Sequence, residues 1–361
     1  MENLVGRSAP GPAGGPVSQR QPLRHAPPRR LIRPRRLRPG DTVALIAPSS
    51  PAYGSNATAR QMIERARSRL HDAGLRTVVG AHAEDAHGYL AGRDEDRAAD
   101  IMAAFTNPDV AGIVCLRGGY GTPRLLDRLD YDVIARNPKV FVGYSDITAL
   151  HLALTQRAGL VTFHGLMGLD LAARPATQAE ADARFFTWEW FLRAVLRPEP
   201  LGPLPARAPW QAGPVHTVVP GTAAGPLAGG NLSLIANTLG TPYEIDTAGK
   251  ILLIEEVSEA PYRIDRMLTQ LRLAGKLDAA AGFIFAEWTD CQPEAGRPSL
   301  TLEQVLADII VPLGKPAVAG LAAGHGPGRL TLPLGAQVRL EAPPGDSGPP
   351  RVMVVEPGVV D

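Results

Sequence analysis

Ser145 occupies a position in which a serine could act as a nucleophile. It follows the apolar run at residues 140–142, and Ile147, Leu150 and Leu154 then recur at helical spacing. We therefore expect a strand, a tight turn and a helix, which would expose the serine beside the unpaired N–H groups of a helix N-terminus. Nucleophilic catalysis needs both features, because an oxyanion forms on attack. The alternative interpretation is an ordinary N-cap serine.

Two carboxylates and a histidine supply the other groups that such a site requires. Glu255 and Glu256 end the apolar run at residues 251–254, and α/β proteins gather functional groups at the carboxyl ends of their strands. Strand alternation would point one of these carboxylates inward. His325 lies between Gly324 and Gly326, which is not typical of a packed core histidine. Solvated charges and a plain loop histidine are the alternatives.

Ser145, Glu255 and His325 thus offer a nucleophile, an acid and a base in that chain order. The histidine would take the serine proton, while the acid would fix the imidazole tautomer and stabilise its cation. Their positions in the sequence do not establish that the three meet in space. His151 lies on the apolar side of its expected helix, and we interpret it as structural.

A glycine-rich loop at residues 117–121 follows another apolar run, at residues 112–116. Glycines let a ligand approach backbone N–H groups closely, so the loop could cradle a phosphate or complete an oxyanion hole. It matches neither the P-loop pattern nor the dinucleotide-binding pattern. A non-enzymatic protein that binds nucleotide or phosphate through this loop is therefore a separate hypothesis. No clustered cysteines and histidines indicate a metal site, and we expect no metal and no cofactor.

Strand-like and helix-like segments alternate along the first half of the chain. Strands are predicted at 42–47, 77–79, 112–116 and 140–142, and helices at 57–73 and from Asp94 to Phe105. This alternation favours an α/β fold with a parallel sheet covered by helices on both faces, as in Rossmann or flavodoxin-like domains. Strands at 251–254, 282–286, 338–340 and 352–355, with helices at 231–239, 264–271 and 302–310, predict a second, smaller α/β domain.

These elements divide the chain into four parts. Residues 1–38 are expected to be a disordered basic arm, 39–172 an α/β domain with the nucleophile, 173–224 a helix near 178–196 and a linker, and 225–361 an α/β domain with the acid and base. The arm is rich in arginine, proline and glycine, and we interpret it as a solvated tail. An electrostatic contact of the arm with nucleic acid or acidic lipid is the alternative.

Composition excludes several classes of function. Residues 1–40 carry nine Arg and one Glu, a net charge of 9 − 1 = +8, so the remaining residues sum to −7 within the total of +1. Because that part is mildly acidic and only 5% of the chain is aromatic, nucleic-acid binding by the folded part is not expected. No apolar run reaches the length of a membrane span, and no signal peptide is expected. Two distant cysteines, Cys115 and Cys291, fit a reduced cytoplasmic setting.

Six blocks of residues resemble, in order and spacing, the LD-carboxypeptidase family of serine peptidases. They run Arg117-Gly118-Gly119-Tyr120-Gly121, Gly143-Tyr144-Ser145-Asp146, Gly230-Asn231-Leu232, Leu253-Ile254-Glu255-Glu256, residues 261–268, and Gly324-His325 to residue 335. The resemblance covers about residues 37–356 and implies two α/β domains with the active site between them.

The resemblance implies Ser145 as nucleophile, Glu255 as the acid and His325 as the base. It also implies an oxyanion hole of backbone N–H groups from Asp146, Gly118 and Gly119. Family members release terminal D-alanine from murein tetrapeptides by cleaving an L,D bond during cell-wall recycling. The resemblance further implies a homodimer and no cofactor.

A carboxypeptidase must also hold the free carboxylate of its substrate, for which arginine is well suited. Arg117 and Arg124 are the candidates near the glycine-rich loop. Tyr120, Tyr144, Asn231 and His164 are further candidates for substrate binding.

The sequence departs from the family pattern in three places. Glu256 stands where Asp is common, which leaves both glutamates as candidates for the acid. Leu166 stands where proline is expected, which would reshape that wall of the substrate site. The basic arm is not a family feature.

A related branch of the family cleaves microcin C-like peptide-nucleotide antibiotics, and this is the alternative enzymatic hypothesis. An aromatic side chain over the active site could stack on a base, and Trp188, Trp190 and Trp210 are the candidates. We expect these tryptophans to serve mainly in packing.

Overall fold

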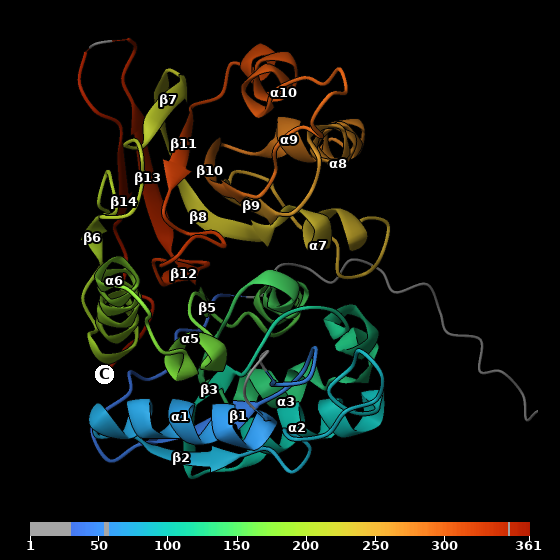
Figure 1. Ribbon diagram of the computed structural model, residues 1–361, viewed down its shortest axis with the longest axis vertical. Coiled ribbons are helices and arrows are strands. Elements are labelled where there is room, and N and C mark those ends of the chain that lie inside the picture. The colour runs from blue at the N-terminus through green and yellow to red at the C-terminus, as the bar shows by residue number, and fades with distance from the viewer. Residues whose placement is uncertain (1–29, 54–57, 346) are drawn as a thin grey trace, which may run out of the picture.

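The computed structural model describes residues 30–53, 58–345 and 347–361. Within these residues the chain forms two halves, each built on one sheet (Figure 1). The two sheets have six and eight strands, and the carboxyl ends of the central strands of both sheets carry the loops that form the site described below. The two-domain α/β architecture is therefore confirmed. No helix in the described residues is long and apolar enough to cross a membrane.

The first sheet has the strand order β12-β5-β4-β3-β1-β2. Its strands are, in that order, β12 (Leu332–Leu334), β5 (Thr162–His164), β4 (Val140–Gly143), β3 (Val110–Cys115), β1 (Thr42–Ile46) and β2 (Arg76–Val79). All neighbours pair in parallel except β12, which runs antiparallel to β5. The predicted parallel sheet is thus present, and a strand from near the end of the chain completes its edge.

Both faces of the first sheet are covered, as the buried apolar strands predict. Val43 and Leu45 of β1 belong to one core cluster with the apolar face of α1 (Ala59–Asp72), whereas Ala44 and Ile46 belong to another with α2 (Asp94–Thr106). Successive side chains of a strand point to opposite faces, so one short strand supplies both clusters. Each fully buried Val, Leu or Ile side chain stabilises the fold by about 1.5–3 kcal/mol.

Local sequence signals fix the ends of these helices. Thr58 and Gln61 form a reciprocal capping box at the start of α1, and the acids Asp94, Glu95 and Asp96 lie in the first turn of α2. Three shorter helices complete this half: α3 (Tyr131–Arg136), α4 (Thr148–Ala153) and α5 (Gly168–Ala172). A 3-10 segment spans Thr122–Arg128, and a π-helical segment, Leu154–Ala158, extends α4.

The second sheet is mixed, as predicted, with the order β6-β14-β13-β8-β9-β10-β11-β7. Its parallel centre consists of β8 (Gly221–Asn231), β9 (Ile251–Val257), β10 (Gly282–Thr289) and β11 (Ala317–Leu321). The antiparallel flanks are β6 (Gly202–Pro203), β14 (Arg351–Val354) and β13 (Gln337–Ala342) on one side and β7 (His216–Val219) on the other. Its helices are α7 (Leu232–Asn237), α8 (Pro261–Leu273), α9 (Lys276–Ala279) and α10 (Leu302–Ile309), with a 3-10 turn at Val311–Leu313.

The segment at 173–224 contains more regular structure than expected. The predicted helix is present as α6 (Gln178–Leu196), but the expected linker also contributes β6, β7 and the start of β8 to the second sheet. The long strand β8 was not predicted, because its sequence, GTAAGPLAGGN, has the glycine and proline content of a loop.

The boundary of the basic arm was also placed too late. Residues 30–38 contact the fold: Ile32 N–H donates to the Gly159 carbonyl over 2.6 Å, and Leu37 is buried and bonds to the Val195 carbonyl over 2.8 Å. The apolar side chain of Leu37 supplies core contacts that the surrounding arginines and prolines obscure in the composition. The rest of the predicted arm, residues 1–29, lies outside the described residues.

Candidate active site

Ser145 lies at a sharp turn between β4 and a short helical segment. Its φ is +62°, one of three positive values at non-glycine residues in the described chain. The 3-10 turn Ser145–Ile147 begins at this residue and leads directly into α4. A side chain in this left-handed conformation carries backbone strain, which is typical of functional turns. The predicted strand, turn and helix are thus present, with the serine at the carboxyl end of its strand.

The glycine-rich loop lies directly against this serine. A Cβ added to Gly118 would stand 3.1 Å from Ser145 Oγ, so only glycine fits there without a shift. Gly119 has φ +116°, and the next N–H, that of Tyr120, bonds to Ser50 Oγ. Within the described residues, the N–H groups of Gly118, Gly119 and Asp146 bond to no other group. Free N–H groups beside a serine hydroxyl are what oxyanion stabilisation requires.

The side chain of Asp146 holds the turn and the loop together. Its buried carboxylate accepts hydrogen bonds from Ser49 Oγ over 2.6 Å and from Thr122 N–H over 2.9 Å, while Thr122 Oγ1 donates to the Asp146 carbonyl. Burial raises the pKa of this carboxyl, and the hydrogen bonds oppose that rise. Three segments are therefore tied to one residue next to the serine.

His325 and Glu255 form a hydrogen-bonded pair. His325 Nδ1 lies 2.7 Å from Glu255 Oε2, and Glu255, at the end of β9, has 0% of its surface exposed. A carboxylate only accepts, so Nδ1 carries the proton and Nε2 is left as the basic nitrogen. Glu255 Oε1 is buried without a hydrogen-bond partner in the described residues. This arrangement orients an imidazole for proton transfer.

Glu256 makes a different set of contacts from Glu255. Its carboxylate accepts from Asn231 Nδ2, from the N–H and Oγ of Ser233 and from the Val257 N–H. It therefore stabilises the start of α7, where Asn231 is the N-cap. Strand alternation separates the two glutamates as expected, and of the two only Glu255 bonds to His325.

Tyr144 and His164 join the two halves of the site. The Tyr144 ring, one residue before Ser145, lies 5.0 Å from the His325 ring. His164 Nε2 donates to the Ala323 carbonyl over 2.8 Å, and burial lowers the pKa of this histidine. The nucleophile and base segments thus meet. The described residues show no hydrogen bond between Ser145 Oγ and His325, and such contacts often tighten only when substrate binds.

The candidate substrate-binding residues have different surroundings. Arg117 is partly buried and bonds to the carbonyls of Pro51 and Tyr53 beside the glycine-rich loop. Tyr120 is exposed and packs edge-on against Tyr89.

The polar groups of two other candidates already bond to residues of the protein itself. Arg124 forms an ion pair with Asp94. Asn231 is buried, and both atoms of its amide bond within the protein. His151, predicted to be structural, is buried and bonds to the Gly143 carbonyl and Thr162 Oγ1.

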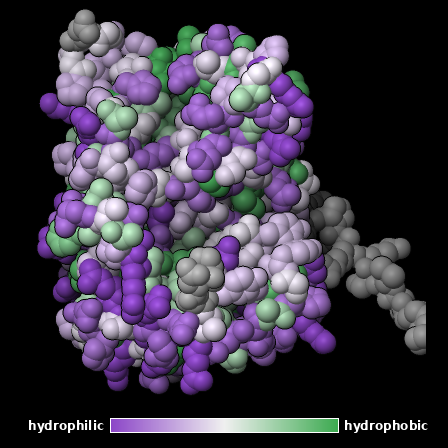
Figure 2. Space-filling model, in the orientation of Figure 1, coloured by the Kyte–Doolittle hydropathy of each residue, from purple (hydrophilic) through white to green (hydrophobic). Residues whose placement is uncertain are grey.

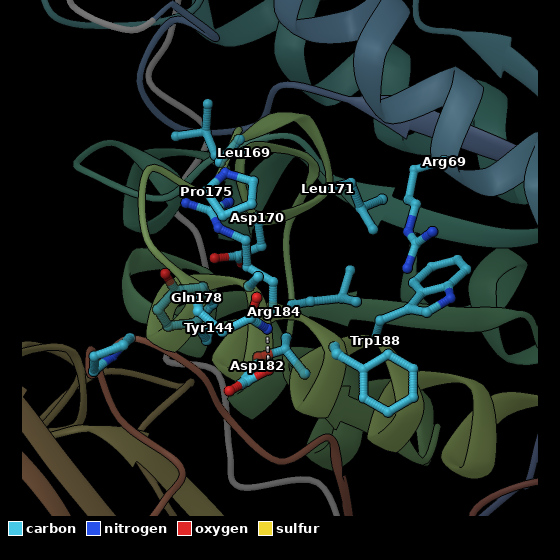
Figure 3. Close-up of a pocket in the computed structure, with 16 residues that line it drawn as sticks. Arg69, Tyr144, Leu169, Asp170, Leu171, Pro175, Gln178, Asp182, Arg184 and Trp188 are labelled. Carbon is cyan, nitrogen blue, oxygen red and sulfur yellow. Dashed lines mark hydrogen bonds between the residues drawn. The ribbon is translucent and has the colours of Figure 1, made fainter. Parts of the chain in front are cut away.

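A pocket of about 740 Å³ adjoins the site between α1, α5 and α6 (Figure 3). Tyr144 and Leu166 line it, together with Pro327 from the loop that carries His325. Arg69 of α1 lies over the Trp188 ring at 4.6 Å. The face shown in Figure 2 is mainly hydrophilic, with smaller hydrophobic areas between the two halves.

The three tryptophans serve mainly in packing, as expected. Trp188 stacks on Phe191, Trp190 packs against Phe186, and the Trp210 indole donates to Glu287 over 3.3 Å. Of the three, Trp188 also lines the pocket.

Arg329, Asp170 and Glu287 belong to the surroundings of the site and were not predicted. Arg329 is buried and bonds to Asp170, and Glu287 lies beneath the loop that carries His325. Arg329 stands four residues after His325 in a glycine-rich block, which is the only sequence signal that could have indicated it.

Comparison with known proteins identifies the family of the chain. The model of the LD-carboxypeptidase N-terminal domain matches residues 43–165, and that of the C-terminal domain matches residues 224–340. The chain belongs to the LD-carboxypeptidase family and is thus a serine-type hydrolase. This excludes the non-enzymatic hypothesis of a nucleotide- or phosphate-binding protein.

Among the relatives is the probable murein peptide carboxypeptidase of Bacillus subtilis strain 168, which is 41% identical over 313 residues, covering 85% of this chain and 91% of the relative. The murein tetrapeptide carboxypeptidase of Pseudomonas aeruginosa PAO1 is 32% identical over 305 residues, covering 83% and 92%.

Solved structures show the same fold. Muramoyltetrapeptide carboxypeptidase from Oxalobacter formigenes is 30% identical with a TM-score of 0.71, covering 86% of this chain and 97% of that one. The microcin C7 self-immunity protein MccF superposes with a TM-score of 0.78 at 24% identity, covering 91% and 99%.

Proposed function

We propose that this enzyme hydrolyses the L,D bond of murein tetrapeptides and releases the terminal D-alanine, with Ser145 as nucleophile, His325 as base and Glu255 as orienting acid. The observation that carries the proposal is the 2.7 Å bond between His325 Nδ1 and the buried Glu255 carboxylate, in contact with the residue that precedes Ser145. The names of the relatives supply the substrate class.

The reaction follows from these positions in two steps. His325 Nε2 takes the proton of Ser145 as Oγ attacks the scissile carbonyl, and the oxyanion is held by the N–H groups of Gly118, Gly119 and Asp146. The protonated imidazole then gives its proton to the leaving amine of D-alanine, which leaves an acyl-enzyme on Ser145. Water, activated by the same imidazole, hydrolyses this ester and restores the serine.

Arg117 is our proposed anchor for the carboxylate of the substrate. It directly precedes Gly118 in the loop against the nucleophile, whereas the guanidinium of Arg124 is already paired with Asp94. Holding a free carboxylate beside the scissile bond is what limits a peptidase to the last residue of a chain.

A substrate panel tests the reaction class. Purified protein is incubated with L-Ala-γ-D-Glu-meso-diaminopimelate-D-Ala, with the same peptide ending in L-Ala, and with the D-Ala-amide. Release from the free D-Ala acid alone is the expected result. Equal cleavage of the amide would contradict a carboxypeptidase, and cleavage of the L-Ala peptide would contradict L,D specificity.

The microcin-type hypothesis gains support from the fold of MccF, structures of which are described as complexes with aspartyl sulfamoyl adenosine and adenosine monophosphate. Adding an aminoacyl sulfamoyl adenosine in competition with the tetrapeptide distinguishes the two. If the enzyme cleaves the nucleotide conjugate preferentially, the substrate is a peptide-nucleotide and not a murein peptide. A homodimer and a cytoplasmic location remain predictions, and light scattering of the purified protein tests the first.

A further inference from the structure

Arg329 bonds to the loop that carries His325 on both sides of the histidine. It stands between β11 and β12, and only 4% of its surface is exposed. Its Nε donates to the Gly324 carbonyl over 3.1 Å and its Nη2 to the Gly326 carbonyl over 3.3 Å. These are the carbonyls on either side of His325. The guanidinium therefore fixes the backbone from which the imidazole projects.

The same guanidinium reaches the half of the molecule that carries the nucleophile. Its Nη1 lies 2.5 Å from Asp170 Oδ1, and its Cζ lies 4.0 Å from the centroid of the Tyr144 ring. Asp170 is itself held at the start of α5, because its Oδ2 accepts the Met167 N–H. One side chain thus connects the histidine loop to α5 and to the residue next to Ser145.

We propose that Arg329 is a positioning residue that sets the imidazole of His325 relative to Ser145 across the junction of the two sheets. This inference rests on the proposed role of His325 as the base. The two catalytic side chains come from different sheets, so their separation depends on contacts that cross between them. A shift of about 1 Å in such a geometry can reduce the rate by about 100-fold.

The chemistry of the guanidinium suits a positioning role better than a role in binding the substrate. A planar fork donates in three directions at fixed angles and lies flat on an aromatic ring, which a lysine ammonium does not reproduce. Nε, Nη1 and Nη2 each make a bond within the protein, and only 4% of the residue's surface is exposed. These contacts favour a positioning role for Arg329 over binding of the substrate carboxylate.

A covalent probe of serine reactivity tests the proposal without assuming a peptide substrate. A fluorophosphonate reacts with an activated serine, and intact mass gives the rate of its addition to Ser145. The variants are Arg329→Lys and Asp170→Asn, with Arg263→Lys as a control, because Arg263 is exposed and pairs with Glu259 on the surface. Steady-state hydrolysis of the tetrapeptide and the melting temperature are measured in parallel.

For Arg329→Lys we expect labelling and kcat to fall by about 10-fold to 100-fold, with KM changed less than about threefold. Asp170→Asn should show a smaller fall in labelling and kcat, because Arg329 keeps its bonds to the carbonyls of Gly324 and Gly326. Arg263→Lys should match the wild type. A purely structural role would lower the melting temperature but leave the labelling rate of the folded protein unchanged, and that result would overturn the inference.

The second variant keeps the test decisive if Arg329→Lys does not fold. Wild-type labelling and kcat in a folded Asp170→Asn protein would then overturn the link across the two halves, whereas a loss in kcat at unchanged KM supports it. Failure of the proposed function looks different: the wild type itself would show no labelling at Ser145 and no release of D-alanine.

Discussion

His325 contacts Glu255 and not Glu256, although the two glutamates are adjacent in the chain. The carboxylate of Glu255 faces the junction of the two sheets, whereas that of Glu256 faces the start of α7 and bonds to Asn231 and Ser233. One residue of strand register therefore separates an acid that orients an imidazole from an acid that caps a helix. The same substitution at each of the two glutamates therefore tests their separate roles.

Glu255→Gln should reduce kcat by roughly 100-fold to 10,000-fold, because an amide neither stabilises the imidazolium nor selects the same tautomer. Steady-state hydrolysis of the tetrapeptide measures this fall in kcat. Glu256→Gln is the matched control: it keeps most of the activity but loses stability, since buried acceptors of several hydrogen bonds are weakened. A larger loss of kcat in Glu256→Gln than in Glu255→Gln would contradict the assignment of the acid.

Gly118→Ala should reduce kcat by roughly 100-fold to 1,000-fold, on the scale of removing one oxyanion donor. The added Cβ would lie 2.9 Å from Ser145 Cβ, so either the serine or the loop must move. The control is Gly213→Ala, where an added Cβ meets nothing within 4 Å. Activity of Gly118→Ala equal to that of the control would show that this loop does not contact the reacting group.

His151 should make the free energy of unfolding depend on pH. Burial lowers the pKa of His151 to about 3 from a usual 6.5, so between these values the unfolded chain binds more protons than the folded one. Stability therefore rises with pH in this window and is lost on acidification from about 6.5, by at most about 1.4 kcal/mol per pH unit for one such group.

Denaturant unfolding at pH 7, 6 and 5 measures this dependence in the wild type and in His151→Gln. The variant is expected to be less stable at pH 7, because it loses the bonds to Gly143 and Thr162, but to show a shallower loss below pH 6.5. An identical slope in both proteins would mean that His151 does not titrate as the buried position requires.

Arg117→Gln should raise KM for the tetrapeptide by about 10-fold or more, since an ionic hydrogen bond to the terminal carboxylate contributes about 1.5–3 kcal/mol. Arg124→Gln serves as the comparison, because the guanidinium of Arg124 is already paired with Asp94. The contrast is read from initial rates over a range of peptide concentrations. An unchanged KM in Arg117→Gln would assign the carboxylate to another group.

The sequence predicted most of what local patterns encode. The strands of the first sheet that lie in apolar runs, the helices with clear caps such as α1, and the turn at Ser145 follow from periodicity and turn chemistry. The triad candidates were found because glycine-flanked and strand-terminal polar residues are rare in a packed core.

What the sequence could not predict depends on contacts between distant segments. β12 is three residues long and pairs with β5 of the first sheet, although the strands before and after it in the chain, β11 and β13, belong to the second sheet. β8 begins in a glycine-rich stretch that looks like a loop. Arg329 resembles any charged residue until the fold brings Asp170 and Tyr144 to it. No local propensity carries such information.

The most direct test of the central claim compares the wild type with Ser145→Ala on L-Ala-γ-D-Glu-meso-diaminopimelate-D-Ala, with D-alanine detected by mass spectrometry. The account predicts release by the wild type and at least a 1,000-fold slower release, on the order of magnitude seen when a triad member is removed, by a variant that folds normally. Release at the wild-type rate by folded Ser145→Ala would contradict it.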